Sequence, residues 1–398
     1  MTRPTARVVW DPAFTAYNFG PEHPMAPIRL DLTARLCDAL GLFAADDVEV
    51  HLPGVASDEV LHTVHDPEFV EAVQRASSDP TQTDLARGLG TEDVPTFEGM
   101  HESSARIVAG SLEMAQAVWR GEIAHGVNFC GGLHHAMSGK ASGFCVYNDI
   151  AVAIQWLLDA GVERVAYIDI DVHHGDGVEA IFWNDPRVLT ASIHETGRAL
   201  FPGTGWPSDI GGAGAPGSSV NVALPPGVTD GPWLRALNAA ILPVVKAFRP
   251  QIIISQHGAD SHAEDPLAHL ALSVDAQREA ADQIHRLAHQ LCEGRWVALG
   301  GGGYEVVDVV PRTWAHLTAI ASHRPVDPRS AVPQEWRDHV ESLFGRSGPA
   351  RMSDLAPGSG LWWRSWDMGY DPASPVDRAV MASRQAVFPH HGLDVWFD

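Results

Sequence analysis

Lysine is almost missing from this chain. Of 398 residues only Lys140 and Lys246 are lysines, and nearly all the basic residues are arginines. The basic residues number 27 against 50 acidic ones, which gives a formal net charge of -23. Such an excess of negative charge repels phosphate groups, so we expect neither nucleic acid nor an anionic membrane as a partner. A cationic substrate would be attracted.

Cysteine and long apolar runs are also scarce. The four cysteines, Cys37, Cys130, Cys145 and Cys292, show no C-x-x-C spacing. This argues against a disulfide framework and a thiolate metal site, and it fits a reducing compartment. No stretch approaches the roughly 20 consecutive apolar residues of a membrane helix, and the first residues form no signal-type apolar block. We therefore expect a cytoplasmic protein.

What the chain does have is a regular alternation of apolar strands and helical segments. With 45% hydrophobic residues it can bury a large core, in one domain or two. The spacing predicts strands at 7–10, 126–129, a stretch from 165, 188–194, 219–224, 251–255 and 296–299. It predicts helices at 28–40, 67–76, 101–119, 150–160, 176–183, 231–248, 275–292, 309–321 and 376–387. This order is typical of βαβ units and a parallel sheet.

The stretch from Val165 to Ile181 carries the strongest chemical signal. It predicts a buried strand with Asp169, Asp171 and His173 on one face, followed by a Gly-Asp-Gly turn. Any one of these residues alone is usually a capping or hydrogen-bonding group. Together they would cost roughly several kcal/mol per buried ion unless a cation or a network compensates them. A divalent metal site explains the pattern better, because oxygen and nitrogen donors suit such a cation.

Other polar clusters follow the predicted strands. His134 and His135 come after a Gly-Gly turn, Asp260 follows the strand at 251–255, and Tyr304 follows four glycines after the strand at 296–299. Taken alone, the histidine pair is as readily structural as functional. Ligands usually bind at the carboxyl ends of strands in α/β sheets, so we expect these clusters to meet there.

In sequence order, these segments form a recognisable series. They are Gly-Gly-Leu-His134-His135-Ala, Ser-Gly-Phe144-Cys-Val-Tyr-Asn-Asp, Asp169-Ile-Asp171-Val-His173-His174-Gly-Asp176-Gly, Phe201-Pro-Gly-Thr-Gly, Gly-Ala-Asp260-Ser-His-Ala-Glu-Asp-Pro-Leu267 and Gly-Gly-Gly-Gly-Tyr304. The series resembles the zinc-dependent histone deacetylase family of the arginase-deacetylase superfamily, most closely its bacterial acetoin-utilisation branch. The resemblance covers about residues 7 to 350. It implies an α/β fold, a single arginase-deacetylase-type domain with a central eight-stranded parallel sheet flanked by helices.

The resemblance also implies roles for individual residues. Asp171, His173 and Asp260 would bind the metal, Zn²⁺ with Fe²⁺ or Co²⁺ as alternatives. His134 and His135 would be the catalytic histidines, oriented by Asp169 and Asp176 respectively. Tyr304 would donate to the oxyanion, and the walls of a substrate tunnel would be Gly143, Phe144, Phe201 and Leu267.

Structural K⁺ and a substrate rim are implied in the same way. The matching potassium positions are Asp169, Asp171, His173, Ser192 and Ile193, with a second group at Phe182, Asp185 and Val188. Glu92 and Asp93 fall in the polar segment 79–95, which in the family forms part of the tunnel rim. In most proteins such acids are simply solvated.

The region beyond residue 350 is not covered by the resemblance. We expect a deacetylase domain at residues 1–350 and a tail at 351–398 that packs on this domain or on a second subunit. The region after 321 contains Trp336, Trp362, Trp363, Trp366 and Trp396, which we expect to be buried. The oligomeric state is left open.

Several functions compete. The first is a deacetylase that acts on acetyl-lysine in a protein, such as the acetyl-CoA synthetase that the acetoin branch implies. The second is an acetylpolyamine amidohydrolase. A non-catalytic acetyl-lysine or metal-dependent binding protein is disfavoured because His134, His135 and Tyr304 are all present. An arginase-like ureohydrolase would need a second metal and would give Tyr304 no role.

Overall fold

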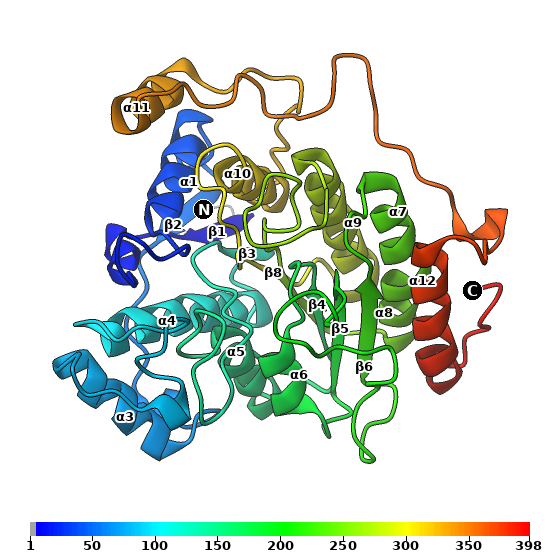
Figure 1. Cartoon of the computed structure of the whole chain (residues 1–398), viewed down its shortest axis with the longest axis horizontal. Coiled ribbons are helices and arrows are strands. Elements are labelled where there is room, and N and C mark those ends of the chain that lie inside the picture. Colours follow the sequence, from blue (N-terminus) through cyan, green and yellow to red (C-terminus); the bar gives the residue numbers. More distant parts are fainter. Residues whose placement is uncertain (1–4) are drawn as a thin grey trace.

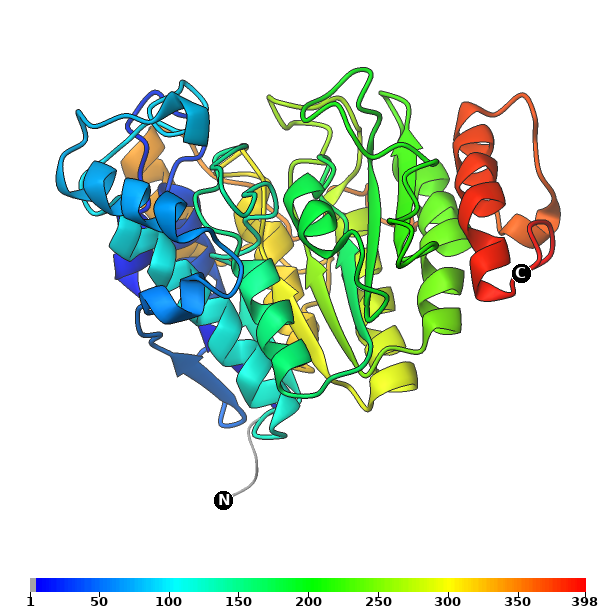
Figure 2. The ribbon, with the colours of Figure 1, turned by 90° about the horizontal axis from the view of Figure 1, so that it is seen from below.

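The computed structural model describes residues 5–398 and contains a parallel sheet of eight strands between helices, which confirms the predicted α/β fold (Figures 1 and 2). The strands are β1 (Ala6–Val9), β2 (Val48–His51), β3 (His125–Asn128), β4 (Val165–Asp169), β5 (Val188–Glu195), β6 (Ser219–Leu224), β7 (Ile252–Gln256) and β8 (Trp296–Leu299). They lie in the order β2-β1-β3-β8-β7-β4-β5-β6. The first four residues of the predicted domain at 1–350 lie outside the described part.

The helices connect these strands and cover the sheet. They are α1 (Ile28–Ala39), α2 (Asp58–Leu61), α3 (Pro67–Ser78), α4 (Met100–Trp119), α5 (Asp149–Asp159), α6 (Asp176–Phe182), α7 (Asp230–Ala236), α8 (Leu242–Phe248), α9 (Val274–Cys292), α10 (Val310–Ala321), α11 (Gln334–Phe344) and α12 (Pro375–Val387). The predicted helix at 231–248 is α7 and α8 joined by a π-helical turn, Leu237–Ile241.

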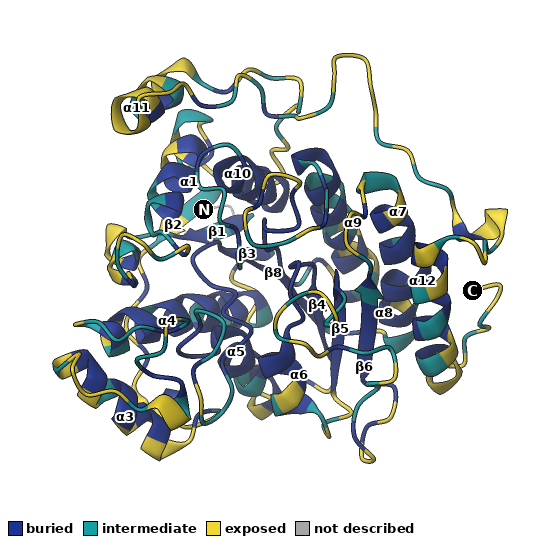
Figure 3. Ribbon diagram, in the orientation of Figure 1, coloured by how far each residue is buried: buried dark blue, intermediate teal, exposed yellow. Residues whose placement is uncertain are grey.

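The central strands are buried along their whole length. Every residue of β3, β4, β5, β7 and β8 is buried, as expected for a parallel sheet covered on both faces (Figure 3). Their near-continuous apolar character made them visible in the sequence. The edge strand β2 alternates valine with Glu49 and His51 and is half-exposed, so no strand was predicted there.

One expectation about β4 is wrong. The strand ends at Asp169, so Asp171 and His173 lie beyond it and not on one face of a strand. The hydrogen-bond ladder of the sheet stops here because backbone N–H groups beyond the end of β4 donate to carboxylates instead of to a neighbouring strand. The N–H of Val172 donates to Asp260 Oδ1 at 3.0 Å and the N–H of His173 donates to Asp171 Oδ1 at 2.9 Å.

The C-terminal region runs over the outside of the molecule and returns as α12 against β6 (Figure 1). Ser383 on α12 donates to the carbonyl oxygen of Asn221 on β6 at 2.5 Å. The expected burial of the tryptophans holds for Trp336 and Trp366, which are 2% and 8% exposed. Trp362 and Trp396 are 72% and 53% exposed on this single chain, so their burial against a second subunit stays a prediction. The tail tethers itself through other side chains, so these two rings are left on its outer surface.

Within residues 5–398, no helix combines the length and apolar character needed to cross a membrane. The expectation of a cytoplasmic protein stays a prediction, as does the boundary between the domain at 1–350 and the tail at 351–398.

Candidate active site

The loops that follow β3, β4, β7 and β8 meet at the carboxyl edge of the sheet and bring the predicted polar residues together. The loop after β8 contacts these residues directly, since the N–H of Gly302 donates to Asp171 Oδ2 at 2.9 Å. A Cβ on Gly302 would overlap Asp260 Oδ2. Only glycine therefore lets the backbone approach the two carboxylates from this side.

Asp171, His173 and Asp260 form the first group of the site. His173 Nδ1 lies 3.1 Å from Asp171 Oδ1 and 3.2 Å from Asp260 Oδ2, and the two carboxylates are fully buried. Gln256 Nε2 donates to Asp171 Oδ2 at 2.6 Å and fixes its orientation. One donor atom from each of the three residues lies within 4.8 Å of the others. Two oxygens and one nitrogen so arranged suit a divalent cation.

The electrostatics of this group favour a cation. Burial and the neighbouring Asp171 raise the pKa of Asp260 to about 7. Burial lowers the pKa of His173, but Asp171 and Asp260 more than offset it and raise the value to about 10. Two buried carboxylates thus face one imidazole. A divalent ion would supply the missing positive charge, so the residues present fit a metal.

His134 and His135 form the second group. Their Nε2 atoms are 3.1 Å apart, and each Nδ1 lies on a carboxylate: His134 at 2.7 Å from Asp169 Oδ2, and His135 at 2.6 Å from Asp176 Oδ1. Tyr167 also donates to Asp169 Oδ2, at 2.6 Å. The four paired residues are those that the sequence singled out, and a carboxylate that accepts the Nδ1–H of each ring fixes the ring's orientation.

The two histidines differ in charge. Burial opposes protonation of His134, but Asp169 and Asp171 raise its pKa to about 9. For His135, burial and the charge on His134 lower the pKa to about 4, although Asp176 partly offsets them. His134 is therefore a cation and His135 a free base at neutral pH. Only His135 can accept a proton.

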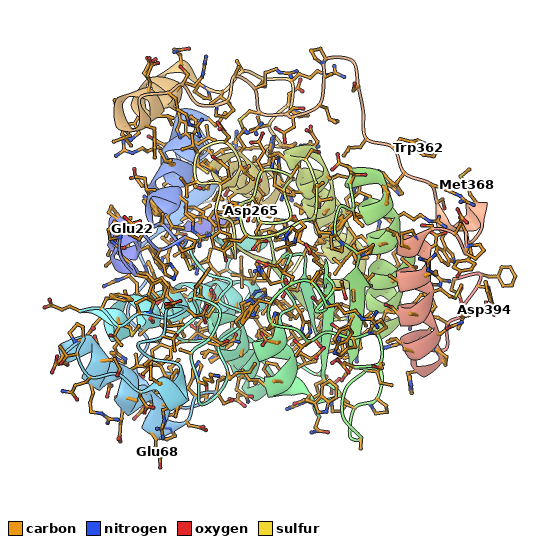
Figure 4. The ribbon with its side chains drawn as sticks, in the orientation of Figure 1. Glu22, Glu68, Asp265, Trp362, Met368 and Asp394 are labelled. Atoms are coloured by element: carbon orange, nitrogen blue, oxygen red, sulfur yellow. The ribbon has the colours of Figure 1, made fainter. Side chains whose placement is uncertain are left out.

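Tyr304 ends the glycine loop that follows β8 and lies near Asp260 and Asp171. Its backbone N–H donates to Asp265 Oδ2 at 2.8 Å, and Asp265 Oδ1 accepts from the N–H of Leu267 at 3.0 Å. Figure 4 labels Asp265 near the middle of the molecule. Burial, helped by Asp260, raises the pKa of Tyr304 well above its usual range. The phenol thus keeps its proton and can donate it to an oxyanion.

Aromatic rings flank these groups. Phe144 packs edge-on against Tyr304 with ring centroids 5.7 Å apart, and Phe201 packs edge-on against His135 at 5.0 Å. Gly143 and Phe144 both have left-handed backbones, with φ of 54° and 64°. A Cβ on Gly143 would overlap the ring of His135, so the wall lies directly against this histidine. Phe201 is 46% exposed, so its ring forms the solvent-facing part of this aromatic wall.

The predicted rim residues lie in different surroundings. Asp93 is half-buried and its Oδ2 accepts from the N–H of Gly143 at 2.7 Å, which joins it to the wall. Glu92 is exposed. The structure thus brings Asp93 to the aromatic wall and leaves its neighbour in solvent.

The positions matched to potassium lie on or just after β4, α6 and β5. Asp169 is the register partner of Ser192, the residue before Ile193 on β5. In the second group, the N–H of Asp185 donates to the carbonyl oxygen of Phe182 at 2.9 Å, and the N–H of Val188 donates to that of Asp185 at 3.2 Å. The first group therefore lies around the pairing of β4 with β5, and the second forms the turn between α6 and β5.

Three supporting residues were not predicted from the sequence. Arg29 is buried and its Nη1 donates to the carbonyl oxygens of Gly301 and Gly303, at 2.9 and 3.0 Å, which holds the glycine loop. Asp149 accepts from the N–H of Gly132 and of Leu133 and so shapes the turn before the histidines. Tyr17 donates to the carbonyl oxygen of Phe144 at 2.7 Å. Two signals were available in the sequence: Arg29 is an arginine among apolar residues at a helix start, and Asp149 ends the segment that begins Ser-Gly-Phe144.

The comparisons with known proteins agree with this geometry. Residues 23–321 match the model of the histone deacetylase domain. The acetoin utilization protein AcuC of Bacillus subtilis is 43% identical over 350 residues, which cover 87% of this chain and 89% of that protein. AcuC of Staphylococcus xylosus is 37% identical over 341 residues, covering 85% and 88%. A solved structure, described as an HDAC homolog complexed with SAHA, superposes with a TM-score of 0.82 at 25% identity and covers 96% of this chain and all of that one. This chain belongs to the histone deacetylase family, in its AcuC branch.

Proposed function

We propose that the protein is a metal-dependent deacetylase that hydrolyses the acetyl amide of acetyl-lysine in proteins to acetate and free lysine. One observation supports this most directly: a neutral His135 and a protonated Tyr304 both lie near the donor atoms of Asp171, His173 and Asp260. A base, an oxyanion donor and a cation site are the three parts that amide hydrolysis needs.

Each residue has a separate task in this proposal. When bound by Asp171, His173 and Asp260, a divalent ion such as Zn²⁺, Fe²⁺ or Co²⁺ supplies a Lewis acid for the acetyl carbonyl and acidifies a water. His135 accepts the proton of the attacking water at Nε2 and returns it to the leaving amine. The Tyr304 hydroxyl donates to the oxyanion that develops on the carbonyl oxygen.

The charge on His134 serves the same reaction. A cation beside His135 keeps the pKa of His135 low enough for it to be unprotonated before attack. Asp169 and Asp176 orient the two rings, and their carboxylates limit how far each ring can rotate.

Substrate choice rests on Asp93. Its Oδ2 accepts from the wall at Gly143, and the second oxygen of a half-buried carboxylate can accept an N–H from an extended peptide on either side of the acetyl-lysine. Acetylputrescine offers no peptide N–H at that position. We therefore propose a protein or peptide substrate. Acetylpolyamine is the second candidate, because the net charge of -23 would also attract that cation.

The test compares an acetyl-lysine peptide with acetylputrescine in the wild type, Asp93→Ala and Asp93→Asn. Asp93→Asn leaves an oxygen that can accept from Gly143 but removes the charge. Glu92→Ala is the matched control, since it removes an adjacent exposed acid. We expect both Asp93 variants to raise KM for the peptide about 10- to 100-fold, from a charge-assisted bond of roughly 1.5–3 kcal/mol. Acetylputrescine turnover should change little.

Two outcomes would contradict the substrate assignment. Faster wild-type turnover of acetylputrescine than of any peptide would favour the polyamine function. Equal losses on both substrates in both Asp93 variants would show that the negative charge attracts either cationic substrate from a distance, because Asp93→Asn keeps the acceptor for Gly143.

The potassium sites stay a proposal as well. Backbone and side-chain oxygens of Asp169, Asp171, His173, Ser192 and Ile193 would hold one K⁺, and those of Phe182, Asp185 and Val188 a second. Replacing KCl by tetramethylammonium chloride at equal ionic strength should then lower both the melting temperature and kcat. No change in either would remove this proposal.

A further inference from the structure

Four histidines that the deacetylase site does not use meet at the opposite edge of the sheet. His125 is the first residue of β3, His285 and His289 lie one turn apart on α9, and His323 follows the end of α10. His125 is separated from His285 by 160 residues and from His323 by 198. The residues of the proposed deacetylase site follow the carboxyl ends of strands, whereas His125 begins a strand. The two sites therefore lie at opposite ends of the parallel strands.

The four Nε2 atoms are almost equally far from one another. Their six mutual distances are 3.0, 3.2, 3.2, 3.1, 3.2 and 2.9 Å. Four points with equal separations form a tetrahedron, and each corner of this one lies about 1.9 Å from the centre. Zinc–imidazole bonds are about 2.0–2.1 Å long. The nitrogens therefore surround a point at close to bonding distance for a four-coordinate ion.

Hydrogen bonds among the rings do not account for this arrangement. A neutral imidazole has one N–H, and its Nε2 is either a donor or an acceptor. Six contacts among four such atoms would leave lone pairs facing lone pairs or N–H groups facing N–H groups. A central cation lets all four lone pairs point inward. The rings of His125 and His289 cross at 87° and those of His285 and His289 at 89°, which removes steric conflict around the centre.

The surroundings hold the rings in place and leave a way in. His125 is fully buried, and Trp296 packs against it and against His285 at centroid distances of 5.7 and 5.5 Å. His323 has a φ of 55°, a left-handed backbone that few residues other than glycine adopt. His289 and His323 are exposed, so an ion can enter from solvent.

We propose that His125, His285, His289 and His323 form a second metal site, a closed tetrahedral centre for a divalent transition-metal ion. Four neutral nitrogen donors in this geometry favour Zn²⁺ over the harder Mg²⁺ or Ca²⁺. With all four positions filled by protein, the ion has no open position for a substrate and is structural. It links the start of β3, the last turns of α9 and His323, the second residue after α10.

The experiment separates this site from the deacetylase metal. The full chain carrying Asp171→Ala and Asp260→Ala serves as the background, because it lacks two of the three donors at the other edge. After equilibration with ZnCl₂ and extensive dialysis, the zinc content per chain is measured by plasma mass spectrometry. We expect one zinc in the background and none after His289→Ala and His323→Ala are added. The control adds His62→Ala and His390→Ala, two exposed histidines outside the cluster, and should keep the zinc.

Two further readouts keep the result interpretable. Cobalt loading of the background should give the strong visible absorption of four-coordinate Co²⁺, absent from the His289→Ala/His323→Ala chain. Circular dichroism verifies that this chain is folded, and both replaced side chains lie at the surface. Because an ion that binds only the folded state stabilises it, chelation should lower the melting temperature of the background alone.

Equal zinc content with and without His289 and His323 would overturn the proposal and identify the metal as adventitious. A background that retains no zinc would overturn it too. The deacetylase assignment does not depend on either outcome, because the four histidines share no residue with the group Asp171, His173 and Asp260.

Discussion

Replacing Arg235 should destabilise the protein far more than replacing an exposed arginine. Arg235 on α7 is 5% exposed and uses all five N–H groups. It makes two bonds of 2.8 Å to the Asp377 carboxylate on α12, and it donates to the carbonyl oxygens of Arg364, Ser365 and Gly369 at 3.0, 2.6 and 2.9 Å. Its guanidinium also lies 4.7 Å from the centre of the Trp366 ring.

The magnitude follows from burial. Arg235→Met leaves the Asp377 carboxylate buried, with the N–H of Asp371 as its remaining bond among those described here. Breaking a buried pair by removing one partner costs about 3–5 kcal/mol. Arg286→Met is the matched control, because Arg286 pairs with Glu279 and Asp282 at the surface with its side chain 56% exposed. Exposed pairs contribute about 0–1 kcal/mol.

Urea denaturation followed by circular dichroism gives the free energy of unfolding, and limited proteolysis reports whether 351–398 detaches first. Burial raises the pKa of Asp377, but the bonds from Arg235 more than offset it and lower the pKa. The pair's stabilisation is therefore complete above the unfolded pKa near 4 and is lost as the pH falls through the folded value. The wild type and Arg235→Met should then converge on acidification.

A double variant decides the cause. Arg235→Met with Asp377→Leu removes both charges and should recover much of the loss, because replacing both partners by apolar groups avoids an unpaired charge. If Arg235→Met and Arg286→Met lose the same free energy and the tail is cleaved no faster, the reasoning from burial is wrong.

Three further predictions concern the active site. Tyr304→Phe should lower kcat about 10²- to 10³-fold with little change in KM, since the hydroxyl is proposed to bind charge present only in the transition state; a rise in KM alone would make Tyr304 a wall residue. Asp176→Asn removes the carboxylate that raises the pKa of His135, so the acid limb of kcat/KM should move to lower pH while the plateau falls about 10- to 100-fold; an unmoved limb would refute His135 as the base. Gly302→Ala should cost metal and activity together in metal analysis and turnover assays, because its Cβ meets Asp260, whereas Gly360→Ala, with open space around it, should cost neither.

The residues that the sequence identified at the site share one property. They stand in short motifs directly after apolar strands, where the fold class alone predicts convergence. His134, His135, Asp260 and Tyr304 were found in this way, and the structure brings them to one edge. The same reasoning placed Asp171 and His173 on β4, which ends earlier because its next amides bind carboxylates. The periodicity within one segment cannot predict that a carboxylate which follows another strand, Asp260, accepts a hydrogen bond from Val172.

The elements that the sequence missed bury little. In α11 only Trp336 and Val340 are buried, one helical turn apart in a stretch that is otherwise polar. In β2 no residue is buried at all, so the strand shows the alternation of an edge and not the apolar run of a core strand. Their formation depends on tertiary partners, such as the Trp336 Nε1–H that donates to the carbonyl oxygen of Leu32 at 2.8 Å.

The histidine cluster was beyond sequence reasoning for a different reason. His285 and His289 have the spacing of two ligands on one helix face, but His125 and His323 come from remote segments with no motif around them. The pairing of β3 with β8, the return of α9 into β8 and the packing of α10 against α9 and β3 bring the four together. A metal site built from isolated residues can be recognised in the folded structure, but it forms no motif in the sequence.

Two proposed metal sites on opposite edges of one sheet change how chelation must be interpreted. Removing every ion from the wild type would stop turnover through Asp171, His173 and Asp260, and would also loosen β3 at His125. His134 follows β3 only a few residues after its end, so a disturbance at one end of this four-residue strand reaches the loop that carries the catalytic histidines. Loss of activity on chelation is thus ambiguous by itself. The zinc content and melting temperature of the His289→Ala/His323→Ala chain separate the two effects, because they report on the second site without passing through catalysis.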